Sequence, residues 1–123
     1  MSESLQAVIR ALFQVAWADQ VVSPVEVHAL TNILRHFGLA LPEVICLLDE
    51  NLAEPPQGAP IPLDQYFDDR EAHLLALQSL LTVCYADGVL QPEEAGYIEG
   101  LVVRMGLSAA ELEQVRQKVT GGR

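Results

Sequence analysis

Apolar residues recur every three or four positions along almost the whole chain, and no stretch alternates apolar and polar residues with the period of a strand. The first such stretch, residues 5–17, has so broad an apolar stripe that we expect its helix to be mostly enclosed. Further stretches follow helix-starting signals near Ser23, Pro42, Asp68, Pro92 and Ser108. The pattern predicts an all-α bundle of about six to seven helices.

Capping residues mark where these helices begin and end. Ser23-Pro24-Val25-Glu26 offers an N-cap serine, a proline at the first helical position and a glutamate at N3, which is a capping box. Gly38 and Gly106 close apolar stretches where a left-handed C-cap is common. Four prolines within residues 54–62 exclude a helix there. We therefore expect an extended connector, followed by a short turn over 63–67.

The chain repeats itself with an offset of 68 residues. Repeat one covers about 5–53 and repeat two about 68–120, joined by the connector 54–62. The matched positions are Trp17 with Tyr85, Ala18-Asp19 with Ala86-Asp87, Pro24 with Pro92, Glu26 with Glu94, and Gly38-Leu39 with Gly106-Leu107. One repeat cannot bury its apolar stripe alone, whereas two facing repeats can. The sequence predicts one domain over 1–123, arranged as a pseudo-twofold, internally duplicated bundle.

Composition and charge narrow the range of partners. A chain of 123 residues fits one domain, and half of its residues are hydrophobic. Its net charge of −10 repels phosphate backbones and anionic lipid surfaces, so we expect neither nucleic acid nor membrane as a partner. A protein partner stays open, as does the choice between monomer and homodimer. No signal peptide or membrane span is expected, which favours a cytoplasmic location.

The remaining reactive side chains predict no enzyme. Cys46 and Cys84 lie in apolar helical stretches without zinc-site spacing, so we expect buried free thiols in a reducing compartment. His28, His36 and His73 are expected on exposed helix faces. The chain has no nucleophile elbow and no glycine-rich phosphate loop. We therefore expect neither catalytic nor cofactor-binding residues.

One acidic motif occurs in both repeats. Asp19 and Asp87 follow a helix C-terminus, where a carboxylate faces the negative end of the helix dipole at a cost of about 0.3–1 kcal/mol. Each is followed seven residues later by a glutamate, Glu26 or Glu94. Two interpretations stay open: these carboxylates accept backbone N–H groups of the turn and helix, or they bind a cation.

An ordinary calcium loop is excluded. If Gly88 were the central glycine of an EF-hand, Glu94 would take the final bidentate position. The first two ligand positions would then be Val83 and Tyr85, which offer no suitable side-chain oxygen. Only convergence of both acidic pairs across the pseudo-twofold axis would supply four carboxylates to a hard cation.

The motif Ala-Asp followed by Pro-Val-Glu or Pro-Glu-Glu, closed by Gly-Leu, resembles the signature of the tellurite-resistance TerB-like family. The resemblance covers both repeats and implies a duplicated helical fold, a role in stress response and the binding of a divalent cation. The acidic residues that it implies as metal ligands are Asp19, Glu26, Asp87, Glu93 and Glu94. Gln20 and Val25 depart from the pattern, so the N-terminal half-site is weakened.

Two functions follow as hypotheses. The first is a non-enzymatic, TerB-like stress-response domain that binds a divalent cation through the duplicated Asp-x6-Glu motif. The second is a protein–protein interaction module with an acidic surface and no metal, which predicts that the fold leaves an apolar or acidic patch exposed.

Overall fold

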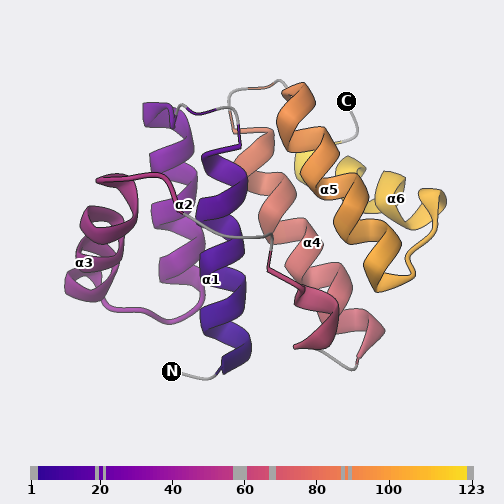
Figure 1. Ribbon diagram of the computed structural model, residues 1–123, viewed down its shortest axis with the longest axis horizontal. Helices are drawn as coiled ribbons and strands as arrows, with labels where there is room; N and C mark the ends of the chain where they lie inside the picture. The colour runs from indigo at the N-terminus through magenta and orange to yellow at the C-terminus, as the bar shows by residue number, and fades with distance from the viewer. Residues whose placement is uncertain are drawn as a thin grey trace.

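The computed structural model describes residues 3–18, 20, 22–56, 61–66, 69–86, 88 and 90–121. Across these residues the chain is all-helical, with no strand, as expected from its periodicity (Figure 1). The elements in chain order are α1 (Glu3–Ala16), α2 (Pro24–His36), α3 (Leu41–Leu52), the 3-10 turn η1 (Leu63–Gln65), α4 (Arg70–Cys84), α5 (Pro92–Met105) and α6 (Ala109–Thr120).

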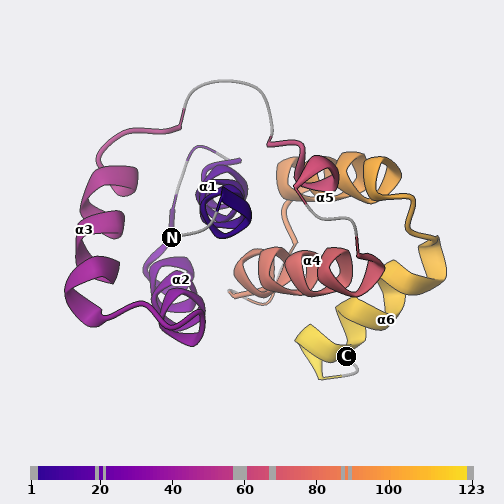
Figure 2. The ribbon, with the colours of Figure 1, turned by 90° about the horizontal axis from the view of Figure 1, so that it is seen from below.

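Helices α1 and α4 form the centre of the bundle and pack against each other. Helix α2 lies on one flank of this pair and α5 on the other, as Figures 1 and 2 both show. Helix α3 is outermost on the α2 side, while α6 packs on α4 at the opposite side of the molecule (Figure 2). The two halves of the chain therefore lie side by side and meet along α1 and α4.

The helix bounds agree with the 68-residue offset found in the sequence. Helices α2 and α5 begin at Pro24 and Pro92, and α3 and α6 begin at Leu41 and Ala109, so each pair differs by the predicted 68 residues. The turns after α2 and α5 also match, because Gly38 and Gly106 both have positive φ, 93° and 69°. The same helix–turn–helix unit is thus built twice.

Burial follows the predicted stripes closely in the central helices. Eight residues of α1 are buried, namely Ala7, Val8, Ile9, Ala11, Leu12, Phe13, Val15 and Ala16. One face of α5 is buried as well, at Ile98, Leu101, Val102 and Met105. Enclosure of α1 on nearly all sides explains why its apolar stripe is so broad.

Helix α3 departs from expectation because it packs mainly against α2 and has one face toward solvent. Of its residues only Val44 is buried, while Ile45 is 49% exposed. Cys84 is a buried free thiol as predicted, but the prediction for Cys46 was wrong, since this thiol is exposed. Apolar periodicity marks α3 as a helix and does not reveal that only one neighbour covers it.

Helix starts agree with the capping residues. Ser23, Asp69 and Ser108 are N-caps whose side chains accept backbone N–H groups of the first turn. Helix α3 begins at Leu41, one residue before the predicted Pro42, with Ala40 as its N-cap. The connector is non-helical at 55–56 and 61–62, and its residues 57–60 lie outside the described part of the chain.

The turn after α1 carries backbone strain that its counterpart after α4 avoids. Gln20 has φ +70°, and the matching residue Gly88 has φ +86°. The two turns have equivalent hydrogen bonds, because Gln20 N–H donates to the carbonyl of Trp17 and Gly88 N–H to that of Tyr85, at 2.8 and 2.9 Å. A glutamine in the left-handed region costs about 1 kcal/mol through its Cβ, and glycine does not have this cost.

We expect Gln20→Gly to raise the free energy of unfolding by about 0.5 kcal/mol, because relief of strain exceeds the added entropy of the unfolded chain. The reciprocal variant Gly88→Gln should lower it by about 1 kcal/mol. Urea denaturation of both variants measures these changes. Destabilisation by Gln20→Gly would show that the glutamine side chain contributes more than its backbone strain costs.

Candidate functional site

The structure places three of the five predicted metal-binding residues. Glu26 and Glu94 lie in the first turns of α2 and α5 and are buried, with 4% and 2% of their surface exposed. Glu93 is exposed at the start of α5. Asp19 and Asp87 lie outside the described residues. Glu26 and Glu94 are the only buried charged residues among those described.

Each buried glutamate takes part in helix capping. Glu26 Oε1 accepts the backbone N–H of Ser23 at 3.0 Å, and Ser23 Oγ accepts the N–H of Glu26 at 3.2 Å. Glu94 Oε1 likewise accepts the N–H of Gln91 at 3.1 Å. The helix N-terminus also favours a negative charge at this position. The capping interpretation therefore accounts for one oxygen of each carboxylate.

The two glutamates belong to opposite flanks of the bundle. The N-termini of α2 and α5 lie at the same end, the upper end in Figure 1, but the α1–α4 pair separates the two helices (Figures 1 and 2). Among the described residues no group of three or more His, Cys, Asp or Glu side chains is placed to hold a metal ion. A shared cation site across the pseudo-twofold axis therefore depends on Asp19 and Asp87.

The connector, counted from here through η1 to Tyr66, covers the seam between α1 and α5 with its described residues 61–66. Gln14 Oε1 accepts hydrogen bonds from the N–H of Ile61 at 2.9 Å and the hydroxyl of Tyr97 at 2.8 Å. Further along, Ser4 Oγ donates to the carbonyl of Tyr66 at 2.9 Å. Between these contacts η1 packs on both α1 and α5, and its Leu63 is fully buried. The connector thus closes this seam with both hydrogen bonds and an apolar anchor.

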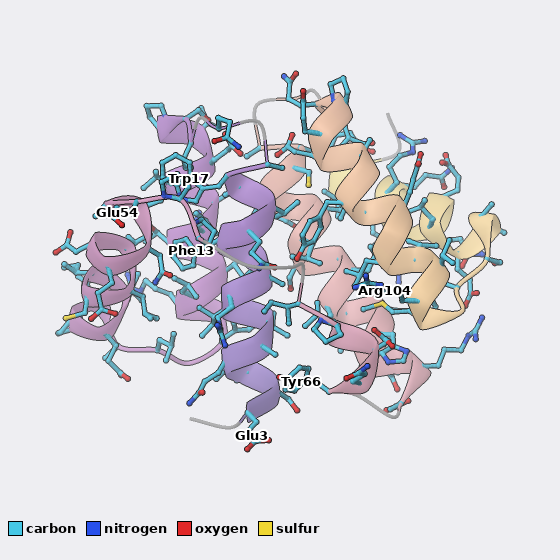
Figure 3. The ribbon with its side chains drawn as sticks, in the orientation of Figure 1. Glu3, Phe13, Trp17, Glu54, Tyr66 and Arg104 are labelled. Carbon is cyan, nitrogen blue, oxygen red and sulfur yellow. The ribbon has the colours of Figure 1, made fainter. Side chains whose placement is uncertain are left out.

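In Figure 3, Trp17 lies near Glu54 at one end of α1, and Tyr66 lies near Glu3 at the other. The indole N–H of Trp17 donates to the carbonyl of Asn51 at 3.0 Å, which ties the end of α3 to the end of α1. A small hollow of about 350 Å³ remains at this end and is bordered by Trp17, Pro55 and Glu93. Glu93 therefore faces the turn of the other repeat.

The opposite seam, between α2 and α4, is an open groove. Its volume is about 980 Å³, and its lining is mainly apolar. Its floor includes Val8, Ile33 and Ala76, whereas Val25 and Leu75 at its edges are 48% and 60% exposed. A second part of the lining is polar and uncharged or weakly basic, and comprises Ser4, His28, Asn32, His36, Gln78, Ser79 and Thr82. No carboxylate is among the described lining residues.

The covered seam and the open groove are equivalent under the internal repeat. A shift of 68 residues relates Gln14 to Thr82 and relates Glu93 and Tyr97 of α5 to Val25 and Ala29 of α2. All of these residues line either the small hollow or the open groove. The pseudo-twofold bundle therefore has two similar seams, of which the connector covers one.

Sequence reasoning missed the groove, although one signal pointed to it. Val25 is conspicuous in the sequence as an apolar residue where the other repeat has the acid Glu93. In the structure it lies half exposed at the edge of the groove. Val25, an apolar residue in place of an acid, thus indicates an exposed apolar surface on α2. The sequence alone does not show that α4 forms the other side of the groove.

Comparison with protein-family models, with curated proteins and with solved structures finds no match to this chain. None of the described helices combines the length and apolar character needed to cross a membrane.

Burial raises the pKa of the Tyr97 phenol well above its ordinary value of 10.0, and the nearby backbone of Ile61 only partly offsets this rise. A raised pKa means that the folded state holds its proton more tightly than the unfolded state. This contribution to stability is complete below pH 10 and is lost progressively as the pH rises further. The free energy of unfolding should therefore fall above pH 10, in part because Tyr97 ionises more easily in the unfolded chain.

We expect Tyr97→Phe to make this fall above pH 10 less steep, because the variant has no phenol to ionise at this site. At neutral pH it should cost about 1 kcal/mol through loss of the hydrogen bond to Gln14. Urea denaturation between pH 7 and 11 measures both effects, with Tyr66→Phe, at an exposed position, as the control. An unchanged alkaline slope in Tyr97→Phe would contradict the assignment.

Proposed function

We propose that this chain is a non-enzymatic helical interaction module whose docking surface is the groove between α2 and α4. The open groove is the observation that supports this function. Its volume of about 980 Å³ lies at the upper end of the range of ligand-binding pockets, about 300–1,000 Å³. Exposed apolar surface costs free energy in water and is recovered when a partner covers it.

Two further features support a protein partner. The edges of the groove present large aliphatic side chains, Val25 and Leu75, which suit apolar contact rather than chemistry. The polar residues around them are hydroxyls, amides and imidazoles, which can hydrogen-bond a peptide backbone. The net charge of −10 disfavours nucleic acid and anionic membranes as alternatives.

Selection from a random peptide library displayed on phage tests this function without assuming a ligand sequence. We expect enriched peptides to bind the wild-type chain and to lose at least tenfold in affinity against Leu75→Asp, because a carboxylate in the groove must be desolvated when the peptide binds. Val103→Asp is the matched control, since Val103 on α5 is 78% exposed and lies outside the groove. Binding should be measured by isothermal titration calorimetry.

The proposal fails if no peptide is enriched. It also fails if the enriched peptides bind Leu75→Asp as tightly as the wild-type chain. Circular dichroism of both aspartate variants checks that each keeps its helical content, which we expect because both substituted side chains are exposed.

Cation binding is the second candidate function, and the matched burial of Glu26 and Glu94 favours it. Two carboxylates at equivalent positions of both repeats, each under 5% exposed, are unusual for side chains whose only need is an N-terminal cap. Carboxylate oxygens suit a hard divalent cation. The resemblance to the TerB-like family adds to this candidate and to a role in stress response. The ligands would be Glu26 with Asp19 and Glu94 with Asp87, and Glu93 would add a carboxylate on the side of the first repeat's turn.

If a divalent cation binds these residues, millimolar calcium or magnesium should raise the Tm of chelator-treated protein, because a ligand of the folded state stabilises it. The double variant Asp87→Asn, Glu94→Gln should abolish most of the rise. Glu99→Gln, at an exposed position of α5, is the control and should leave it intact. Differential scanning calorimetry measures the shift, and an unchanged Tm in the wild-type chain would exclude this candidate.

A further inference from the structure

The connector shows how a seam of this bundle binds a peptide segment. Residues 61–66 lie along α1 and α5, and their anchor Leu63 is buried completely, beneath a segment that begins Ile61-Pro62. Pro62 has no N–H and lies at φ −79°, so the segment loses little conformational freedom when it binds. Ile61, Pro62 and Leu63 therefore form the aliphatic-Pro-aliphatic part of this cover.

The second seam is built from the equivalent helices and has no such cover among the described residues. Helices α4 and α2 present to it the positions that α1 and α5 present to the connector, related by the 68-residue offset. The floor of the open groove includes Val8 of α1 and Ala76 of α4, which are themselves equivalent positions and are both buried. The open groove is thus the symmetry counterpart of a site that already binds a segment of the chain, namely Ile61-Pro62 followed by the 3-10 turn η1.

We propose, resting on the function proposed above, that the groove between α2 and α4 binds a segment of a partner protein with the pattern aliphatic-Pro-aliphatic, in which the chain turns at the second aliphatic residue as it does at Leu63. The second aliphatic residue takes the place that Leu63 has on the covered seam. The apolar edges at Val25 and Leu75 enclose it from both helices.

The polar residues that line the groove can form hydrogen bonds with the backbone groups of such a segment. On the covered seam, Gln14 accepts an N–H of the connector and Ser4 donates to one of its carbonyl groups. On the open seam, Thr82 stands at the position equivalent to Gln14, and the hydroxyls of Ser79 and Thr82 can each accept a further hydrogen bond. Asn32 on α2 offers both donors and an acceptor from the facing side.

Symmetry also specifies the direction of the bound segment. The connector passes from Gln14, in the C-terminal half of α1, to Ser4 at its N-terminal end, so it runs antiparallel to α1. The equivalent segment in the groove runs antiparallel to α4. Its N-terminal end lies near Thr82 and its C-terminal end near Ala72.

The chain's own connector, supplied as a separate peptide, is the sharpest probe. A fluorescein-labelled peptide of residues 54–66 should bind the full chain with a micromolar Kd by fluorescence anisotropy. Leu75→Asp and Val25→Asp should each weaken this binding at least tenfold, and Val103→Asp should leave it unchanged. The peptide carrying Leu63→Asp should not bind, because its anchor would bring a charge into the apolar groove.

A spin label at the N-terminus of the same peptide tests the direction. We expect it to broaden the backbone amide signals of Thr82 and Ala86 in the protein's NMR spectrum and to spare those of Ala72. The reverse pattern would overturn the inferred direction of the segment.

Several results would overturn the proposal. They are the absence of saturable binding, equal binding of the Leu63→Asp peptide, and binding that neither groove variant weakens, since the peptide would then replace the connector at its own seam. Dimerisation in sedimentation experiments that Leu75→Asp abolishes would instead assign the groove to a second copy of the chain. If library peptides of another class bind the groove while the connector peptide does not, the interaction function stands and this inference fails.

Discussion

The pairing of α1 with α4 is the contact on which the rest of the molecule depends. Helix α1 is apolar around most of its circumference, with eight buried residues, and one flanking helix cannot enclose such a surface. Helix α4 of the second repeat supplies the missing neighbour. Because each repeat completes the core of the other, neither has a full core by itself, and the seams between them follow from this arrangement.

Much of the fold could be predicted from the sequence because its signals are local. Capping residues such as Ser23 and Ser108, and glycines such as Gly106, determine helix ends through contacts within a few residues. The 68-residue repeat was visible for the same reason, since its identities lie at these helix ends. The exposure of Cys46 was not predictable in this way, because it depends on how many helices cover α3.

Less of the candidate site than of the fold could be predicted from the sequence. The repeated acidic motif singled out Glu26 and Glu94, and both are buried in the structure. The partners of these carboxylates could not be predicted, because they depend on the positions of loops from both repeats. The groove left almost no trace in the sequence, because residues far apart in the chain form it: Val25 of α2 and Leu75 of α4 are ordinary helix residues until the two helices meet. Surfaces made by tertiary packing have no periodicity of their own.

Joining two equivalent repeats in one chain breaks the symmetry between them, and the covered and open seams show this. Two identical units that pair about a twofold axis create every inter-unit surface in duplicate, whereas joining them covalently requires a single linker. That linker, here residues 54–62 with η1, can lie across only one of the duplicate surfaces. A fused pair of repeats therefore has one covered and one open surface as soon as it is joined. The open surface can bind a single partner, whereas a symmetric dimer would offer two equivalent binding surfaces.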